Sequence, residues 1–220
     1  MDLRENYNGI LELFKVQAPV GYSDEEIADA KDAVGELPSG LEDFYRFCGD
    51  SPELKGLQDE FVLPDKYPSF FNAPNNEYIV FFNENQGVCR AAVKKSDVLL
   101  ADPPVYTSTA NGWALSAPKL SDFLTAMFDY QASICLEYNP EEFFFISRQE
   151  KARIEKMFPK LGGFNCWLYD WSITVYGENG GRISLMEQEG EEDIQMNWAA
   201  NNEEEFKRMS ELLKDIGEPI

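Results

Sequence analysis

Two predicted β-hairpins constrain the fold of this chain more than any other feature of its sequence. In the first, a β-prone run at residues 78–82 leads through a Glu-Asn-Gln-Gly turn at 84–87 into a partner strand at 87–93. In the second, strands at 166–176 and 182–186 flank a Glu-Asn-Gly-Gly turn. Asparagine and glycine tolerate the positive φ that tight hairpin turns require. The sequence therefore predicts two antiparallel meanders.

Each hairpin is followed by a Trp-Ala strand and then by a helix. Trp113 precedes a predicted helix from about Leu120, and Trp198 precedes one from about Asn202. Two interpretations remain open: an internal pseudo-repeat, or chance similarity between two meanders, a common unit. Under either, the predicted fold class is α+β, an antiparallel-rich mixed sheet flanked by helices, in which the two meanders join in one sheet or stack as related halves. Neither half has helices enough to cover both sheet faces, so residues 1–220 are predicted to form one domain.

Capping patterns mark where helices begin and end. Ser23, Ser39 and Ser147 are each followed three residues later by glutamate, the capping-box pattern of a helix N-terminus. Gly49 is expected to end the helix that starts at Ser39, in the left-handed conformation. The first meander is thus preceded by two short helices, and a third opens the last third of the chain.

The segment Asp102-Pro103-Pro104-Val105-Tyr106 interrupts the first meander. Both prolines lack the N–H that a strand donates to its neighbour, so the segment is predicted to be an ordered loop or an edge segment. Asp102 is expected to organise that loop.

A possible catalytic group, Glu84 with the amides of Asn85 and Gln86, has a simpler explanation. Around Gly87 these side chains suit a tight turn in which they cap local amides, and we favour that structural role. Trp113 and Trp198 are likewise predicted to be core residues on a sheet face, with a rim-exposed tryptophan as interface anchor as the alternative.

The chain has no histidine, which excludes whole enzyme classes. Ser-His-Asp and Cys-His nucleophiles, HExxH zinc sites and the 2-His-1-carboxylate iron site all require it. The cysteines are far apart in sequence and are predicted to be buried free thiols, without a CxxC metal pair or a disulfide scaffold. A two-carboxylate glycosidase remains possible by composition, but no spacing singles out a pair. We therefore predict no catalytic residue, no metal and no cofactor.

Charge is the second strong constraint. Forty acidic and 19 basic residues give a net charge of −21, which repels nucleic acid and anionic membranes and attracts basic partners. The longest apolar runs are far shorter than the roughly 20 residues needed to cross a bilayer. A soluble cytoplasmic protein that binds a basic protein, with no nucleic acid or membrane partner, is the expectation.

The acidic charge is concentrated between Arg182 and Lys207, where no basic residue occurs. Such a run is usually a solvated face, but unbalanced charge that a basic partner would relieve is the functional alternative. The residues are Glu187, Glu189, Glu191, Glu192, Asp193, Glu203, Glu204 and Glu205. The first five, on a predicted surface loop, are the candidate partner-binding residues.

An ordered set of short motifs across roughly residues 25–135 resembles the SUKH superfamily, which groups bacterial toxin-immunity proteins with a fungal cell-wall assembly regulator. The motifs are Leu37-Pro38 leading into Leu41, Phe44 and Tyr45, then Phe81-Phe82-Asn83-Glu84-Asn85-Gln86-Gly87-Val88-Cys89, Asp102-Pro103-Pro104-Val105-Tyr106, Trp113, and Phe123-Leu124. Their order and spacing make the resemblance more specific than any single motif. Residues 139–220 match less and form a C-terminal extension or second half.

The resemblance implies an α+β fold and a protein that binds and neutralises a cognate polymorphic toxin, often a nuclease or a deaminase. The fungal branch implies the alternative, a regulatory scaffold that recruits cellular partners without a toxin. The acidic, histidine-free composition independently favours a charge-complementary inhibitor of a basic protein.

Overall fold

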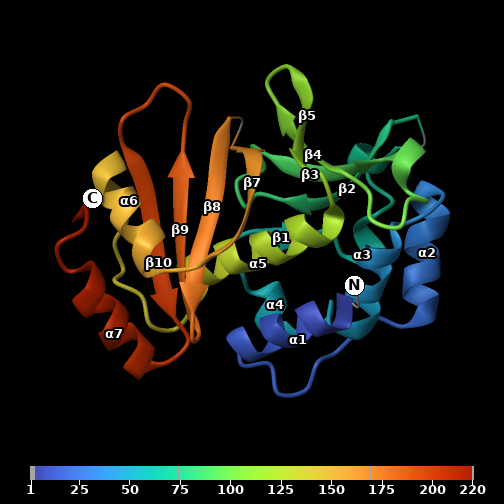
Figure 1. Cartoon of the computed structure of the whole chain (residues 1–220). Coiled ribbons are helices and arrows are strands. Elements are labelled where there is room, and N and C mark those ends of the chain that lie inside the picture. The colour runs from blue at the N-terminus through green and yellow to red at the C-terminus, as the bar shows by residue number, and fades with distance from the viewer. Residues whose placement is uncertain (1–2, 74, 169, 220) are drawn as a thin grey trace.

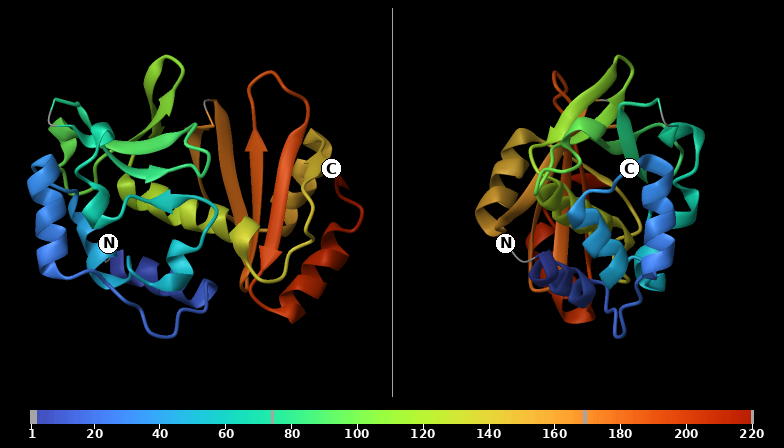
Figure 2. Two further views of the ribbon diagram at one scale, coloured as in Figure 1. Left: turned by 180° about the vertical axis from the view of Figure 1, so that it is seen from behind. Right: turned by 90° about the vertical axis from the view of Figure 1, so that its right-hand side faces the viewer.

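The computed structural model describes residues 3–73, 75–168 and 170–219 and has an α+β fold of two antiparallel sheets. A long central helix, α5, runs beneath the first sheet and across one face of the second (Figures 1 and 2). The helices are α1 (Leu3–Leu13), α2 (Asp24–Val34), α3 (Ser39–Phe47), α4 (Pro52–Lys55), α5 (Leu120–Cys135), α6 (Arg148–Met157) and α7 (Glu203–Leu213), with 3-10 turns η1 (Pro64–Lys66), η2 (Phe70–Asn72) and η3 (Lys95–Asp97).

The first sheet is a five-stranded meander in the order β1-β2-β3-β4-β5. Its strands are β1 (Glu60–Phe61), β2 (Tyr78–Asn83), β3 (Arg90–Lys94), β4 (Val105–Thr109) and β5 (Gly112–Ala117). The predicted first hairpin is confirmed as β2 and β3, which pair in antiparallel register from Tyr78 with Lys94 to Asn83 with Arg90.

The second sheet has six strands in the order β11-β6-β10-β9-β8-β7. They are β6 (Phe144–Ile146), β7 (Lys160–Trp167), β8 (Trp171–Glu178), β9 (Gly181–Glu187), β10 (Ile194–Ala200) and β11 (Glu218–Pro219). The predicted second hairpin is confirmed as β8 and β9, and its turn places Asn179 at φ 48° and Gly180 at φ 88°. Positive φ at both central residues is the geometry that matches the twist of the flanking strands. The predicted first strand at 166–176 is wrong at its start, because residues 166–167 end β7 and β8 begins only at Trp171.

The two meanders lie side by side but do not form one continuous ladder. Side chains of the first sheet bond instead to the backbone of β7: Thr107 Oγ1 donates to Cys166 O at 2.9 Å, and Ser116 Oγ to Asn165 O at 2.6 Å. In the first meander β4 separates the hairpin from the Trp113 strand, whereas β10, which carries Trp198, pairs directly with β9. The two halves therefore place the Trp-Ala strand differently relative to the hairpin. This difference favours chance similarity between two meanders over an internal pseudo-repeat.

The main core fills the space between the first sheet, α5 and the inner face of the second sheet. Phe128 of α5 packs against Phe44 and Phe61, and Phe123 packs against Phe164 of β7. A second core lies on the other face of the second sheet, under α6 and α7. No helix among the described residues has both the length and the apolar character to cross a membrane.

The capping predictions are confirmed at two of three helices. Ser23 and Ser147 form complete capping boxes. The prediction at Ser39 is wrong, because Pro38 occupies the N-cap position and no side chain caps that helix. Gly49 is also not left-handed, as Cys48 is the C-cap, at φ −151°. Glycine is needed at position 49 for a different reason, because a Cβ atom there would lie 2.8 Å from Tyr45 Cα.

The prediction for residues 102–106 is half right. Pro103 and Pro104 precede the ladder, as their missing N–H groups require. Val105 and Tyr106, however, belong to β4, an interior strand that pairs with β3 on one side and β5 on the other. The prolines restrict only their own positions, and the sheet begins at the next residue.

Candidate functional site

A polar groove opens between the tip of the β4–β5 hairpin and the β9–β10 loop, which stand apart at the top of Figure 1. Its volume is about 890 Å³. Strands β7 and β8 supply the floor and the two projections supply the walls. The lining includes Thr109 and Ala114 of the hairpin, Asp170, Glu187, Glu189 and Arg148. We call this cavity the acidic groove.

The predicted acidic loop reaches this groove through Glu189, but Glu187, which also lines the groove, is not part of the loop. Glu187 pairs with Ser172 as the last residue of β9, is half-buried, and makes an ion pair with Lys151 of α6. The ladder extends one residue further than turn composition indicates, so placing Glu187 on a free surface loop was wrong. The exposed loop carboxylates are Glu189, Glu191, Glu192 and Asp193.

These four carboxylates make no ion pair with any residue that the structure describes. The loop is nevertheless held in place by polar contacts around it. Gln188 Nε2 donates to Asp170 Oδ2 at 3.0 Å, and Arg148 Nη2 donates to the backbone O of Glu191 at 3.3 Å. Four like charges are therefore displayed on a short, anchored connection, an arrangement that attracts cationic groups over a long range.

The rest of the acidic run lies elsewhere. Glu203, Glu204 and Glu205 form the first turn of α7, at the opposite end of β10 from the loop (Figure 1). Glu205 is buried and binds the Arg208 guanidinium with both oxygens, at 2.8 and 2.6 Å. The seven residues of β10 span roughly 23 Å, so the run divides into two separate groups.

The structural role of Glu84 is confirmed. Its carboxylate accepts hydrogen bonds from the backbone N–H of Gln86 at 2.9 Å and of Val88 at 3.1 Å, while Asn85, Gln86 and Gly87 are exposed at the turn. Gly87 has φ 72°, the left-handed conformation that the turn requires. These residues shape the hairpin.

Sequence reasoning missed the buried carboxyl group behind this turn. Asp59 accepts from Asn85 N at 3.1 Å and exchanges two hydrogen bonds with the Gln131 side chain, at 2.8 and 3.0 Å. Burial raises the pKa of Asp59 to about 6, opposed by the Asn85 and Gln131 hydrogen bonds, while Glu84 raises it further. Asp59 and Gln131 are 72 residues apart in the chain, so no local pattern announces the contact.

Asp102, which was predicted to organise its loop, instead ties that loop to α5 and caps the helix. Its two oxygens accept from Ser121 N at 2.9 Å and Ser121 Oγ at 2.6 Å. The α5 N-cap residue, Lys119, provides no side-chain cap. A carboxylate brought in from the preceding loop thus binds a backbone N–H that the first turn leaves unsatisfied.

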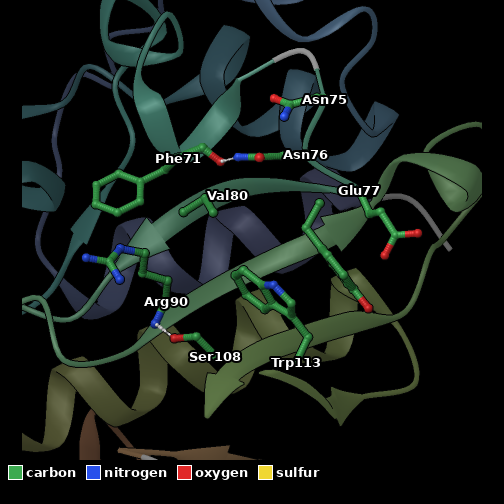
Figure 3. Close-up of a pocket in the computed structure, with 9 residues that line it drawn as sticks. Phe71, Asn75, Asn76, Glu77, Val80, Arg90, Ser108 and Trp113 are labelled. Atoms are coloured by element: carbon green, nitrogen blue, oxygen red, sulfur yellow. Dashed lines mark hydrogen bonds between the residues drawn. The ribbon is translucent and has the colours of Figure 1, made fainter. Parts of the chain in front are cut away.

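The two tryptophans differ in environment. Trp198 is buried and stacks on Phe206 at 5.2 Å, which confirms the core prediction. Trp113 is only half-buried; it stacks on Tyr78 at 4.8 Å and lines a second pocket (Figure 3). The core prediction is therefore met only in part for Trp113, which packs against the main core but leaves part of its side chain open to the pocket, and its role as an interface anchor stays a prediction.

All four cysteines are free thiols, and they differ in exposure. Cys48 and Cys89 are buried as predicted, whereas Cys166 is half-buried and Cys135, the last residue of α5, is exposed. Burial raises the pKa of Cys48 to about 12, so its thiol stays protonated at neutral pH. Among the described residues, no three histidine, cysteine, aspartate or glutamate side chains are grouped so that they could hold a metal ion.

No protein-family model, curated protein or solved structure matches this chain. A function for the protein therefore has to be inferred from the chemistry of the acidic groove and from the sequence.

Proposed function

We propose that this protein is a SUKH-type immunity protein that neutralises a basic polymorphic toxin, such as a nuclease or a deaminase, by binding it directly. One observation carries the proposal: the β9–β10 loop displays four exposed carboxylates without ion-pair partners among the described residues, and one of them, Glu189, lines a polar groove between two projecting hairpins. The resemblance of residues 25–135 to the SUKH superfamily supports it, as does the net charge of −21.

The charges of the groove fit a cationic partner. Among the described residues that line it, Arg148 is the one cation, against the carboxylates of Asp170, Glu187 and Glu189. Lys151 from α6 balances Glu187, and the exposed carboxylates of Asp170 and the loop face solvent. Lysine or arginine side chains from a partner would relieve the repulsion among these groups as they bind.

This arrangement accounts for neutralisation by occlusion. A toxin that acts on nucleic acid needs a basic surface to bind phosphates. An acidic groove that covers that surface competes directly with the substrate, and long-range attraction raises the association rate by about 10 to 10³-fold at low ionic strength. Most of the binding free energy then comes from a few side chains that are desolvated at the centre of the interface.

The experiment is to measure association of the purified chain with the basic C-terminal domain of a toxin encoded beside its gene. The test variant replaces Glu189, Glu191 and Glu192 by Gln and Asp193 by Asn. We expect association at least ten-fold slower at low salt, with a flatter salt dependence, and an unchanged melting temperature because exposed charges contribute little to folding.

A matched control removes four exposed carboxylates far from the groove. Glu25→Gln, Asp29→Asn and Asp32→Asn in α2, with Glu53→Gln in α4, change the net charge by the same amount. If both variants slow association equally, only the overall charge acts and the groove is not the docking surface. Binding of a cellular partner without any toxin binding would favour the regulatory scaffold instead.

A further inference from the structure

The second pocket lies on the face of the five-stranded sheet that is turned away from the core (Figure 3). Along β3 and β4 the half-buried Arg90 and Ser108 alternate with Ala91 and Thr107, which are fully buried. The pocket has a volume of about 460 Å³, within the range of about 300 to 1,000 Å³ typical of small-molecule sites. We call it the Trp113 pocket.

Among the described residues that line the pocket, Arg90 provides the one positive charge, and that charge is not balanced. The guanidinium lies over the Phe71 ring, 3.9 Å from the ring centroid, which fixes its plane. It makes no ion pair or hydrogen bond with any described residue, and Nε is buried without an acceptor. A buried donor on a charged group is costly to leave unsatisfied. The two Nη groups are not among the buried atoms, so they are the donors that an acceptor in the pocket can reach.

Aromatic rings form the opposite wall. Trp113 and Tyr78 stack at 4.8 Å with an angle of 20° between their planes, and Tyr106 supports Tyr78 edge-on at 5.5 Å. The flat surface that they present suits a planar ring.

The spacing of the strands sets the size of the ligand. Arg90 N donates to Ser108 Oγ at 2.9 Å, and Ser108 pairs directly with Trp113 across β4 and β5. The backbones of Arg90 and Trp113 are therefore two strand spacings apart, which is roughly 10 Å. A two-ring aromatic acid is about that long, so its acidic group can meet Arg90 while its rings lie against Trp113.

The charge of the pocket selects a monoanion. Arg90 is a single cation, Glu77 is also at the pocket edge, and Figure 3 shows its carboxylate directed away from Arg90. In a chain of net charge −21 a doubly charged phosphate meets more repulsion than a carboxylate does. A planar guanidinium also matches a carboxylate with two parallel hydrogen bonds.

We propose that the Trp113 pocket binds a small aromatic monocarboxylate, with the carboxylate on Arg90 and the ring system against Trp113. The pocket and the acidic groove occupy opposite faces of the β4–β5 hairpin: Ser108 and Trp113 line the pocket, whereas Thr109 and Ala114 line the groove. Ligand binding here is thus independent of the proposed toxin binding, and either can fail alone.

The first test compares three probes on the wild-type protein by isothermal titration calorimetry: 2-naphthoate, the uncharged 2-naphthamide and the dianionic 2-naphthyl phosphate. We expect 2-naphthoate to bind at least ten-fold more tightly than the amide and more tightly than the phosphate. Equal binding of acid and amide, tighter binding of the phosphate, or no binding of 2-naphthoate would overturn the proposal.

The second test assigns the binding to Arg90. Arg90→Gln should remove the preference for acid over amide, and Arg90→Lys should retain only part of it, because a lysine keeps the charge without the planar fork. Arg153→Gln, an exposed arginine of α6, is the control and should leave binding unchanged. Urea unfolding verifies that each variant is folded. A folded Arg90→Gln protein that still binds 2-naphthoate more tightly than 2-naphthamide would contradict the assignment. If that variant does not fold, the comparison of the three probes on the wild-type protein decides.

Discussion

Replacing Asp59 by asparagine should change how the stability of this protein depends on pH. Asp59 is 4% exposed, and burial raises its pKa from 3.8 to about 6. Because the folded-state pKa lies above the unfolded-state value, the folded protein binds this proton more tightly. Stability is therefore lost as pH rises through the interval from about 4 to 6.

The difference between 3.8 and about 6 corresponds to about 3 kcal/mol, at 1.36 kcal/mol per pKa unit. Asparagine cannot ionise, so Asp59→Asn escapes this penalty at neutral pH. Because the Asp59 carboxyl of the unfolded chain is already more than half ionised at pH 4, the stability of the variant relative to wild type should rise by about 2.4 kcal/mol between pH 4 and pH 7.5. A hydrogen bond lost on substitution shifts the comparison equally at both pH values and does not affect this difference.

Urea unfolding of both proteins at the two pH values measures the effect. Asp65→Asn, in the exposed ion pair with Lys66, is the control, and should change stability by less than about 1 kcal/mol at either pH. If the free-energy difference between Asp59→Asn and wild type is the same at pH 4 and pH 7.5, Asp59 does not carry a raised pKa and the reasoning is refuted.

Two further substitutions test how the fold is held together, both by urea unfolding at pH 7.5. Asp129→Ala should cost about 3–5 kcal/mol, because it strands the partly buried Arg182 guanidinium that Asp129 pairs; a cost below about 1 kcal/mol would mean that solvent already screens the pair. Asp102→Ala should cost about 0.5–2 kcal/mol through loss of the α5 cap, and an unchanged stability would show that Ser121 needs no partner from the loop.

The features that the sequence predicted correctly depend on contacts between residues close in the chain. The turn around Gly87 and the capping boxes at Ser23 and Ser147 are complete within a few residues, so their side chains alone specify them. The box pattern at Ser39 failed because Pro38, just before it, already occupies the cap position. Local patterns predict local hydrogen bonds, and a neighbouring residue is enough to displace one.

The features that the sequence did not reveal depend on distant contacts. Glu187 has a half-buried ion pair because Lys151 of α6, 36 residues earlier, packs behind β9. The same holds for the Trp113 pocket, which Arg90 and Trp113 line from strands that are separated in the sheet by β4. Helix packing decides the first contact and strand order the second. Hydrophobic periodicity predicts neither, and it left open whether the two meanders form one sheet or two.

Survival of cells that express the neighbouring basic toxin domain together with this chain tests the central claim most directly. If the protein neutralises that toxin through its acidic groove, the wild-type chain and the Glu25, Asp29, Asp32, Glu53 variant restore growth. The four-residue variant of the 189–193 loop, expressed at the same level, restores it only at higher doses. The account is contradicted if the toxin domain kills cells equally well with and without the wild-type chain. It is also contradicted if the loop variant protects fully at the lowest dose at which the wild-type chain protects.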